Sequence, residues 1–461
     1  MVSFDQFILN LRDSNIEQAD KISLISNACK ENLWFKEVLK YTYDPFIQFY
    51  IKDNYPPFVE ASDSSIPFDN TLWINTIQPL LIKLNKRELD RKTYTEVIMN
   101  IESKLSKLDQ ELLKCIITKD LRIGFAAKRI NASLNEELIP VSDCQLCKAY
   151  SPDMNIKNVN GWWASRKLNG LRGRWQFRNG EYRFLTREDY PLIGFDDISN
   201  ELKYLQEKYD LKLIDGEVFN MNLPFQTIMS VARGTKTFNP EQKKLLTFNV
   251  FNIQRNNHKY KDTKEMIDYI NTIFSNEKLN YIVPLEYVWC NNSAKDIVKL
   301  CEQFTDEGYE GVVLRDEKIS WEGAKRNNHL LKYKIFYECD LVVKDIIFGV
   351  KGKRLENSIA ALLSEGIVRA RKVQVNDKDI LYRPVAFMES SDDAEYVDIP
   401  VSVEVSCSSC TDEEREVLTK LGKSVIGNTV ECKFQTFTDK PNDKGVYSLQ
   451  FPVFSKFKNV V

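Results

Sequence analysis

The feature that most constrains the fold of this chain is a change in sequence texture near Asp143. After this residue, short runs rich in β-branched and aromatic residues alternate with Asn, Asp, Gly and Pro, which is typical of strands and turns. Before it, glycines are rare and apolar side chains recur at steps of three and four, which predicts one stripe of a single helix. That stripe consists of Ile98, Ile101, Leu105, Leu108, Leu112 and Cys115. The chain is therefore expected to begin as helices and to continue as mixed strands and helices.

The length of 461 residues predicts several domains, because a single hydrophobic core stops growing at about 250–300 residues. We expect a multidomain α+β protein with a helical domain at 1–142, an α+β domain at 143–338 and a small β-barrel at 339–461. A loop is expected at 55–69, where Pro, Ser and Asp are frequent. In the α+β domain we expect a helix at 294–304 and strands at 175–185, 211–219, 245–253, 311–315 and 330–336. In the last domain we expect strands at 341–348, 401–405 and 429–434.

Composition indicates a globular protein without a membrane span, since 43% of residues are hydrophobic, 28% are charged, and no apolar run approaches the roughly 20 residues that cross a bilayer. The first residues lack the features of a secretory signal. Ten cysteines in a chain of this length form no dense disulfide framework, which favours reduced thiols. We therefore expect an intracellular, cytoplasmic location.

Two cysteine pairs, Cys144/Cys147 and Cys407/Cys410, have the spacing of zinc ligands. They lie far apart in the sequence and have no histidine nearby, so we favour small buried or surface residues over a joint zinc site. The chain has only two histidines, which argues against a mechanism based on histidine.

Local charge is more informative than the formal net charge of −2. Between residues 157 and 187, eight basic residues stand against a single acid, Glu181. This stretch indicates a positive field, although a solvated cationic face is the simpler explanation if the segment is considered alone. A second basic segment surrounds Gly124, where backbone N–H groups at a helix start and adjacent cations can hold a phosphate. Its cations are Lys119, Arg122, Lys128 and Arg129.

Lys167 is a candidate nucleophile, because it lies between an expected strand at 161–165 and a tight turn at Gly170. A lysine amine attacks only after its pKa is lowered by neighbouring positive charge or by desolvation, and Arg166 and Arg172 are close in sequence. A surface turn explains the Lys-x-Asn-Gly pattern equally well when it is taken by itself. As a surface lysine, its replacement by alanine should leave the fold unharmed.

Paired charges follow in order along the chain. Asp215 and Glu217 are two residues apart in an apolar strand, so their carboxylates face the same side. Glu310 and a glycine open another apolar strand, and Lys332 and Lys334 share one face of a third. Because buried acids need a metal or cations, these residues predict a pocket with acids for Mg²⁺ and lysines for phosphate oxygens.

The ordered segments KLNGLR, Thr186-Arg187, LIDGEV, FNVFNI, EGVVLR and LLKYK resemble the nucleotidyltransferase motifs of ATP-dependent DNA ligases. The segment DLRIGFAAKRIN resembles the helical DNA-binding domain of phage-type members. The segments CSSCTDEERE, VECKFQTFT and SLQFPVFSKFK resemble the oligonucleotide-binding (OB-fold) barrel that follows in this family. The likeness spans nearly the whole chain, and six loose motifs in the right order are together highly specific.

This resemblance implies that the chain seals nicked duplex DNA as a monomer that encircles its substrate, in replication, repair and recombination, with a viral or phage setting as one option. It implies ATP as the AMP donor and Mg²⁺ or Mn²⁺ as the metal, with Lys167 forming a bond to AMP. Arg172 and Glu217 would hold the ribose, Phe251 rather than Phe248 would stack on adenine, and Lys332 and Lys334 would bind the α-phosphate. Asp215 and Glu310 would bind metal, and the roles of Asp215 and Glu217 could be exchanged. Arg187 would contact the 5′-phosphate of the nick, and DNA would also meet Lys119, Arg122, Lys128 and Arg129.

Two positions depart from the family pattern. Asn169 stands where members usually have Asp, which preserves the turn but removes a charge. Near the C-terminus only Lys456 and Lys458 replace an Arg-rich motif, and lysine lacks the forked geometry that holds phosphate. We therefore expect slow self-adenylylation. The alternatives are an RNA ligase or capping nucleotidyltransferase, and a non-catalytic DNA-end-binding relative of ligases.

Overall fold

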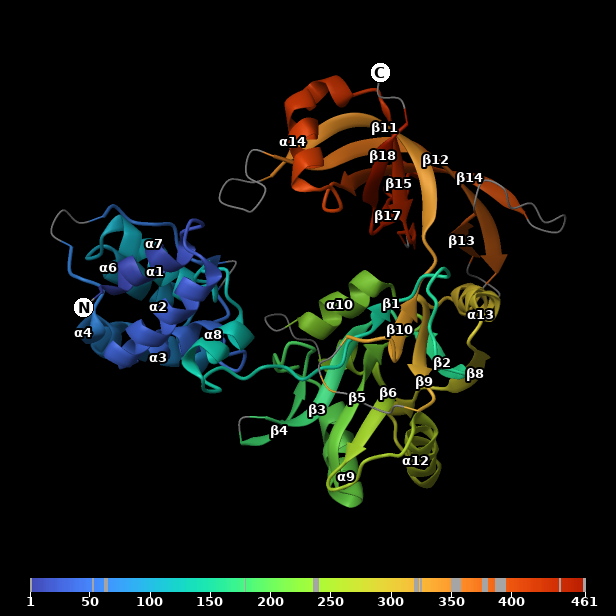
Figure 1. Ribbon diagram of the computed structural model, residues 1–461, viewed down its shortest axis with the longest axis horizontal. Coiled ribbons are helices and arrows are strands. Elements are labelled where there is room, and N and C mark those ends of the chain that lie inside the picture. The colour runs from blue at the N-terminus through green and yellow to red at the C-terminus, as the bar shows by residue number, and fades with distance from the viewer. Residues whose placement is uncertain are drawn as a thin grey trace. The chain divides into compact units, whose positions relative to one another are not determined.

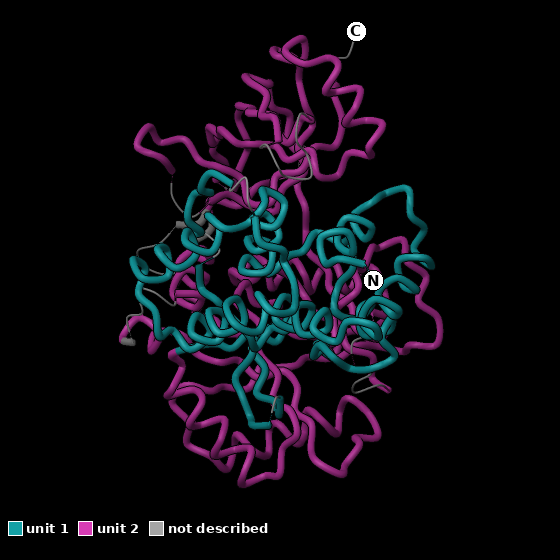
Figure 2. The backbone as a smooth tube through the Cα atoms, turned by 90° about the vertical axis from the view of Figure 1, so that its left-hand side faces the viewer, with its two compact units in different colours: residues 1–144, 173–193 teal, residues 145–172, 194–461 magenta. Residues whose placement is uncertain are grey.

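The computed structural model describes residues 2–51, 54–61, 65–178, 180–234, 240–318, 323, 326–349, 358–374, 380–385, 395–438 and 441–458 (Figure 1). The backbone packs into two compact units (Figure 2). Unit 1 contains residues 1–144 and 173–193, and unit 2 contains residues 145–172 and 194–461. Among the described residues, no helix is both long enough and apolar enough to cross a membrane.

Helices build most of unit 1, as the sequence predicts. Their apolar faces form one core that includes Phe7, Leu11, Ile25, Leu81 and Ile116. The described residues between 55 and 69 are not helical, in keeping with the expected loop. The helices are α1 Phe4–Arg12, α2 Gln18–Glu31, α3 Leu33–Tyr43, α4 Asn70–Leu72, the π-helix η2 Trp73–Ile77, α5 Gln78–Asn85, α6 Arg91–Glu102, α7 Lys107–Ile117 and α8 Ala127–Leu134.

The prediction of one helix through 98–115 is wrong, because the chain forms α6 and α7 with a break at 103–106. Ser106 caps the second helix, since its hydroxyl accepts a hydrogen bond from the Asp109 N–H at 3.2 Å. The Gln110 side chain donates to the carbonyl of Glu102 at 2.8 Å and so joins the two helices across the break. Most of the stripe is buried in the same core, which explains why its helical spacing continues through the break.

Unit 1 also contains a β-hairpin, where we expected a single strand at 175–185. The hairpin consists of β3 Leu171–Arg178 and β4 Glu181–Leu185, and the pairing runs from Arg174 with Leu185 to Arg178 with Glu181. Gly180 has a φ of +89°, a conformation that glycine adopts readily, which lets the chain reverse between the strands.

The first part of unit 2 contains two sheets and the helices that cover them. One sheet has the order β1-β10-β9-β2-β8, and in the other β5 pairs with β6 and β6 with β7. Helix α13 packs on β8 and β9, α9 on β5 and α12 on β6 (Figure 1). The strands are β1 Lys148–Ala149, β2 Gly161–Lys167, β5 Leu211–Phe219, β6 Thr247–Arg255, β7 Ile282–Pro284, β8 Tyr287–Asn291, β9 Gly311–Asp316 and β10 Leu330–Tyr333. The helices are α9 Asp196–Tyr209, α10 Phe225–Arg233, α11 Pro240–Lys243, α12 Thr263–Asn276 and α13 Ala294–Asp306.

Strands again dominate after residue 337, as predicted. One sheet has the order β11-β15-β18-β14-β12-β13, and β11 also pairs with β12, so the pairing returns to its first strand. The strands are β11 Tyr337–Phe348, β12 Ile359–Gln374, β13 Ile380–Pro384, β14 Tyr396–Ser406, β15 Thr429–Phe434, β16 Thr436–Phe437, β17 Leu449–Gln450 and β18 Val453–Phe457. The helices are α14 Asp412–Leu421, which begins with a capping box at Thr411 and Glu414, and the 3₁₀ helix η3 Gly422–Val425.

Separate apolar clusters support the multidomain α+β prediction. One cluster lies among the N-terminal helices, a second gathers residues between Tyr150 and Leu331, and a third gathers residues between Leu341 and Leu449. The boundary between residues 338 and 339 stays a prediction. The segment 173–193 packs with the helices in unit 1.

Candidate active site

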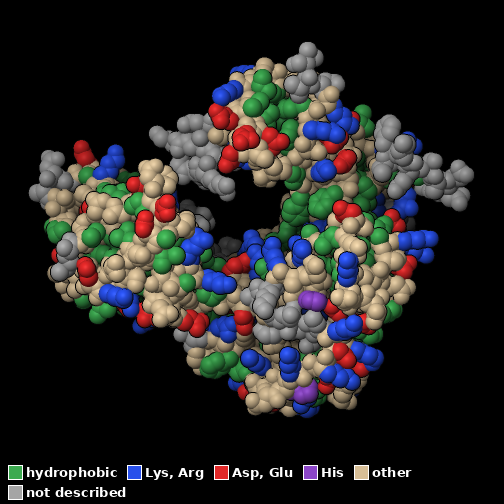
Figure 3. Space-filling model, in the orientation of Figure 1, with side chains coloured by type: hydrophobic (Ala, Val, Ile, Leu, Met, Phe, Trp, Pro, Cys, Tyr) green, Lys and Arg blue, Asp and Glu red, His purple; other side chains and the backbone are tan. Residues whose placement is uncertain are grey.

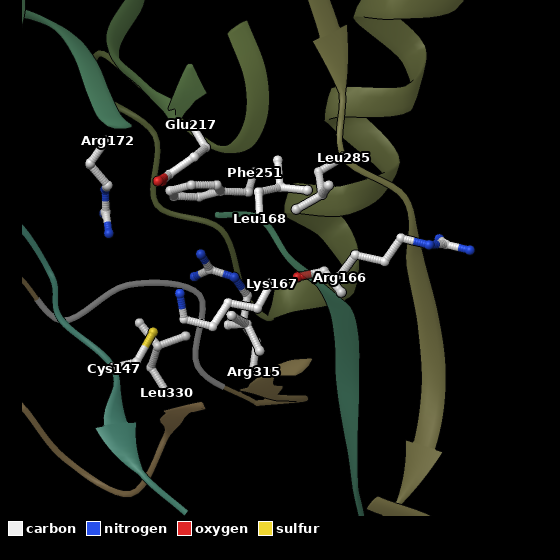
Figure 4. Close-up of a pocket in the computed structure, with 12 residues that line it drawn as sticks. Cys147, Arg166, Lys167, Leu168, Arg172, Glu217, Phe251, Leu285, Arg315 and Leu330 are labelled. Carbon is white, nitrogen blue, oxygen red and sulfur yellow. The ribbon is translucent and has the colours of Figure 1, made fainter. Parts of the chain in front are cut away.

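A pocket in unit 2 brings together most of the residues that the sequence predicts to bind a nucleotide (Figure 4). β2 contributes Lys167, β5 contributes Glu217, β6 contributes Phe251 and β9 contributes Arg315. The pocket is lined by Cys147, Ser165, Arg166, Lys167, Leu168, Arg172, Glu217, Phe251, Leu285, Val313, Arg315 and Leu330.

Lys167 is the last residue of β2, not a residue beyond its end. It pairs with Gly311 of β9, and the backbone N–H of Glu310 donates to the Lys167 carbonyl at 2.9 Å. Because side chains alternate along a strand, Arg166 and Lys167 project in opposite directions. Figure 4 shows the Lys167 amine inside the pocket and the Arg166 guanidinium pointing away. Arg166 instead binds Glu307 at 2.6 Å and Glu286 at 2.7 Å.

Glu310 joins two lysines that are 143 and 24 residues away in sequence. One carboxylate oxygen accepts from Lys167 and the other from Lys334, and the Glu310 side chain is only 5% exposed. Burial raises the pKa of this carboxyl, but the two lysines outweigh burial and leave its pKa lowered. Burial lowers the pKa of the Lys334 amine, although the charge of the Glu310 carboxylate acts in the opposite direction. The site therefore holds an ionised carboxylate between two amines.

Lys167 is thus not the surface lysine that the sequence led us to expect. Its side chain is 21% exposed and forms an ion pair with a buried carboxylate. Breaking such a pair is more costly than removing an exposed lysine. The prediction that Lys167→Ala leaves the fold unharmed is therefore corrected to a measurable loss of stability.

Two glycines bring the backbone segments of the pocket close together. A Cβ on Gly170 would lie 2.3 Å from the carbonyl oxygen of Val218, so this turn packs directly on β5. Gly311 has a φ of +148°, and a Cβ there would lie 2.3 Å from the carbonyl oxygen of Tyr333. These approaches explain why glycine follows both Lys167 and Glu310 in the motifs.

The carboxylates of β5 have different environments. Asp215 accepts two hydrogen bonds from Arg172, at 2.8 and 2.6 Å, and its side chain is 2% exposed. Glu217 lines the pocket, where burial raises the pKa of its carboxyl to about 7, while Lys167 and Arg172 oppose the shift. The structure therefore separates the two acids that the sequence left exchangeable: Asp215 fixes an arginine, and Glu217 faces the cavity.

Phe251 lines the pocket, whereas Phe248 is fully buried in the core. The guanidinium carbon of Arg172 lies 4.7 Å from the Phe251 ring centroid and that of Arg315 lies 5.5 Å from it. The half-buried Phe251 ring thus lies at the cavity beside two guanidinium groups, and its stacking on adenine stays a prediction.

No role in a nucleotide pocket was predicted for Arg315 or Tyr287, and Cys147 was considered only as a possible zinc ligand. Arg315 is 5% exposed and donates to the Tyr287 hydroxyl at 3.1 Å, and that hydroxyl donates to the Phe251 carbonyl at 2.6 Å. The alternation along β9 was a usable signal, since Val313 and Arg315 share the face that lines the pocket. Cys147 approaches from elsewhere in the sequence, without such a signal.

Lys332 lies on β10, paired with Val313, and is not among the lining residues of the pocket. The positive charge of Lys332 helps to lower the pKa of Lys334, so the charges of the two lysines interact. The phosphate-binding role of Lys332 stays a prediction.

The basic segment 119–129 separates into one half-buried cation, Lys119, and three exposed ones. The Lys119 amine donates to the carbonyls of Tyr41 at 2.7 Å and Asp44 at 2.9 Å. Burial lowers the pKa of this amine to about 7, and the Asp44 carboxylate opposes the shift. Lys119 therefore has a structural role in this conformation. Arg122, Lys128 and Arg129 are exposed and remain available as DNA contacts.

Arg187 follows β4 in unit 1, and its side chain is 55% exposed beside Glu188. The C-terminal cations are paired instead with acids: Lys458 lies 2.8 Å from Asp340 and 3.4 Å from Glu431, and Lys456 lies 3.6 Å from Glu431. On the face seen in Figure 3, both basic and acidic side chains are present.

The cysteine pairs do not form a zinc site in the part of the chain that the structure describes. Among these residues, no three His, Cys, Asp or Glu side chains gather in a way that could hold a metal ion. Cys407 and Cys410 are buried, and Arg415 donates to both of their carbonyls. They belong to the C-terminal core, as the simpler prediction had it.

Comparison with known proteins extends these observations. Residues 144–334 match the family model described as ATP dependent DNA ligase domain. The DNA ligase of African swine fever virus (isolate Warthog/Namibia/Wart80/1980) is 30% identical over 196 residues, which are 41% of this chain and 45% of that protein. The match therefore spans less than half the length of this viral relative. The DNA ligase of Haemophilus influenzae (strain ATCC 51907 / DSM 11121 / KW20 / Rd) is 27% identical over 224 residues, which are 48% of this chain and 73% of that protein.

A solved structure named Pmar-Lig_PreS3 resembles this protein over nearly its whole length. The TM-score is 0.74 and the identity is 24%, with 99% of this chain and 100% of that chain covered. A second structure, named Pmar-Lig_Pre., also has a TM-score of 0.74, at 23% identity, and covers 100% of both chains. The fold outside residues 144–334 is therefore also shared with solved proteins.

Proposed function

We propose that this protein is an ATP-dependent DNA ligase, because residues 144–334 match the family model described as ATP dependent DNA ligase domain. It seals nicks between a 5′-phosphate and a 3′-hydroxyl in duplex DNA. The observation that carries the proposal is the Lys167 amine, which lies in the pocket and shares Glu310 with Lys334. A lysine among cations and a buried carboxylate is suited to form a covalent intermediate.

The first step forms a bond between Lys167 Nζ and the α-phosphorus of ATP. The amine must lose a proton first, and the bond from the α-phosphorus to the bridging oxygen breaks, so pyrophosphate leaves with the electron pair. The 5′-phosphate of the nick then takes AMP from Lys167, and the 3′-hydroxyl finally displaces AMP. Positioning and charge neutralisation supply most of the acceleration in such transfers.

The pocket residues suit the parts of the nucleotide. Phe251 offers a ring for adenine, and Glu217, together with Arg172, offers hydrogen-bonding groups for the ribose. Lys334, with Lys332 nearby, offers positive charge for the α-phosphate. The Arg172–Asp215 pair supports this assignment, because two hydrogen bonds fix the guanidinium beside the ring.

Mg²⁺ or Mn²⁺ takes oxygen ligands, and Glu310 supplies a carboxylate beside the nucleophile. Both oxygens of Glu310 accept from lysines, and both oxygens of Asp215 accept from Arg172. Either acid would therefore hold a metal only after one of these cations moves away. When bound, the metal would neutralise charge on the phosphate oxygens.

We assign the remaining parts by the same resemblance. The helices at 1–142 would bind duplex DNA with Arg122, Lys128 and Arg129, and Arg187 would bind the 5′-phosphate. The strands after 339 would form an OB-fold barrel, which the return of their pairing from β12 to β11 supports. The protein would act as a cytoplasmic monomer that encircles nicked DNA, and the viral relatives make a viral setting the favoured one.

Incubation with α-labelled ATP and Mg²⁺, followed by nicked duplex DNA, tests the proposal. We expect a labelled protein, a mass increase of one AMP on Lys167, and loss of the label as the nick is sealed. A protein that acquires no label would contradict ligase activity. If DNA binding persisted without the label, the protein would be a DNA-end-binding relative, which Asn169 keeps as the second candidate.

A parallel reaction with single-stranded RNA separates DNA ligase from RNA ligase, since only the latter should join it efficiently. GTP in place of ATP tests a capping nucleotidyltransferase, which would form a labelled protein with GTP. We expect ATP and nicked duplex DNA to be preferred in both comparisons.

A further inference from the structure

The turn that presents Arg187 is held by hydrogen bonds on both of its sides. The Asp189 N–H donates to the Thr186 carbonyl at 3.1 Å, and the Tyr190 N–H donates to the Thr186 hydroxyl at 3.1 Å. The Ser142 hydroxyl donates to the Arg187 carbonyl at 2.6 Å. The backbone of Arg187 is therefore fixed from two segments of unit 1, while its guanidinium stays at the surface.

Beneath this turn lies a buried cluster of charges. The Asp189 side chain is fully buried and accepts from Arg174, which is 1% exposed, and Arg178 lies 3.5 Å from its other oxygen. Asp143 receives both arginines, each at 2.7 Å. Arg174 also donates to the Ser142 hydroxyl at 2.9 Å. One arginine thus links Asp189 to the serine that holds Arg187.

Both the backbone conformation and the buried charges of this cluster cost free energy of folding. Asp189 has a φ of +64°, a region that side chains other than Asn and Asp seldom adopt and that glycine would adopt without strain. Replacing buried ion pairs with apolar residues often leaves stability unchanged or improves it. Strained backbone conformations cluster at functional sites, where the surrounding structure holds a side chain in a set position.

The charges of the cluster also cancel one another. Two arginines, Arg174 and Arg178, face two carboxylates, Asp143 and Asp189. Arg187 therefore lies outside a neutralised cluster, with Glu188 as its exposed partner. A phosphate can replace this partner, because a bidentate arginine–phosphate contact is stronger than an exposed ion pair.

We propose that Asp189, acting through Arg174 and Ser142, is a positioning residue that fixes Arg187 for recognition of the 5′-phosphate at a nick. The inference rests on the proposed ligase function and deepens it. Asp189 contacts no substrate. It holds the turn through Arg174 and Ser142, so its loss should affect phosphate recognition more than DNA binding in general.

The experiment compares Asp189→Asn with the parent protein and with Glu102→Gln. Asparagine keeps the size and tolerates the left-handed backbone but removes the charge. Glu102 is also fully buried in unit 1 and accepts a hydrogen bond from the Tyr55 hydroxyl, so Glu102→Gln is a matched control for a lost buried carboxylate. Binding is measured in EDTA with two fluorescein-labelled nicked duplexes, one with a 5′-phosphate and one with a 5′-hydroxyl.

We expect Asp189→Asn to lower the preference for the 5′-phosphate duplex by about tenfold, the size of one charge-assisted contact. Affinity for the 5′-hydroxyl duplex and the rate of self-adenylylation should stay within about twofold of the parent. Glu102→Gln should lower the melting temperature and leave the preference unchanged. Ser142→Ala is a milder variant that should lower the preference by about threefold, and it keeps the test informative if Asp189→Asn folds poorly.

The inference is overturned if Asp189→Asn and Ser142→Ala retain the preference of the parent, whatever their melting temperatures. A preference lost equally in Glu102→Gln would also overturn it, because general destabilisation would then be the cause. A parent protein that neither acquires label nor seals nicks would overturn the proposed function itself, and that failure is visible before any variant is made.

Discussion

The nucleotide pocket and the basic segment 119–129 both place a lysine away from bulk water, but they give it different partners. Lys167 faces the carboxylate of Glu310, which also holds Lys334. Lys119 instead donates to the backbone carbonyls of Tyr41 and Asp44. Desolvation lowers the pKa of Lys119 to about 7, whereas Lys167 has a buried carboxylate as its partner. The difference separates a site arranged for charged phosphates from an amine that joins two parts of the helical core.

Removing the nucleophile should have the largest effect. Lys167→Arg keeps a cation beside Glu310 but cannot supply a neutral amine, because a guanidinium does not deprotonate. We expect self-adenylylation to fall by at least about a thousandfold, with little change in melting temperature. Lys167→Ala should also lose the label but unfold more easily, by about 1–3 kcal/mol. Labelling by α-labelled ATP and thermal denaturation of both variants measure these effects. Label retained by Lys167→Arg would show that another residue carries AMP.

Glu310→Gln tests whether the shared carboxylate organises the pocket. Both lysines lose their charged partner, so we expect self-adenylylation to fall by roughly a hundredfold. The measurement is the single-turnover rate at saturating ATP and Mg²⁺. Glu302→Gln, on the exposed side of α13, is the control and should leave the rate unchanged. A Glu310→Gln rate close to that of the parent would mean that the ion pairs are only structural.

Lys119→Met should affect stability, and the effect should depend on pH. The variant leaves two carbonyls without their donor, so we expect it to unfold more easily by about 1–3 kcal/mol. The folded-state pKa of Lys119 is lowered to about 7 from an ordinary 10.5. Between these values the unfolded chain binds more protons than the folded one, so parent stability rises with pH in that window. Stability contributed by the neutral amine is fully present above the ordinary pKa and declines as pH falls towards 7.

Urea denaturation of the parent and Lys119→Met at pH 7 and pH 9.5 measures this trend. We expect the parent's advantage to be larger at the higher pH. An advantage that is constant or decreases with pH would show that the amine is charged in the folded protein.

Lys128→Ala should have the smallest effect, because this lysine is exposed and contributes long-range charge. If it contacts a DNA phosphate, the slope of log K against log salt should decrease by about 0.9. Titration of labelled nicked duplex at several salt concentrations measures the slope. Lys203→Ala, an exposed lysine of α9 that is paired with Glu207, is the control. Equal slopes for the two variants would remove Lys128 from the DNA contacts.

The sequence predicted local structure well where one pattern dominated. The strand at 211–219 coincides with β5, and the helix at 294–304 lies within α13. The predicted elements were wrong where two elements share one pattern. This occurs in the stripe divided between α6 and α7 and in the hairpin at 175–185. In both cases the side chains keep their spacing through the break, so periodicity alone cannot locate it.

For the candidate site, the motif order identified Lys167, Glu217, Phe251, Glu310 and Lys334, which the structure brings to the pocket or its edge. These residues could be predicted because each lies in a short motif with a glycine or an alternating strand pattern. Arg315 and Tyr287 were missed, since their hydrogen bond joins residues 28 positions apart.

The sequence by itself determined which residue types lie on which face of each strand, because alternation is a local property of the backbone. Only the tertiary structure decided which charges meet. Lys167 and Glu310 are 143 residues apart, and the hydroxyl of Ser142 reaches the carbonyl of Arg187 across 45 residues. Burial and partner choice set whether a cation is charged, fixed or free, and both depend on packing between distant segments.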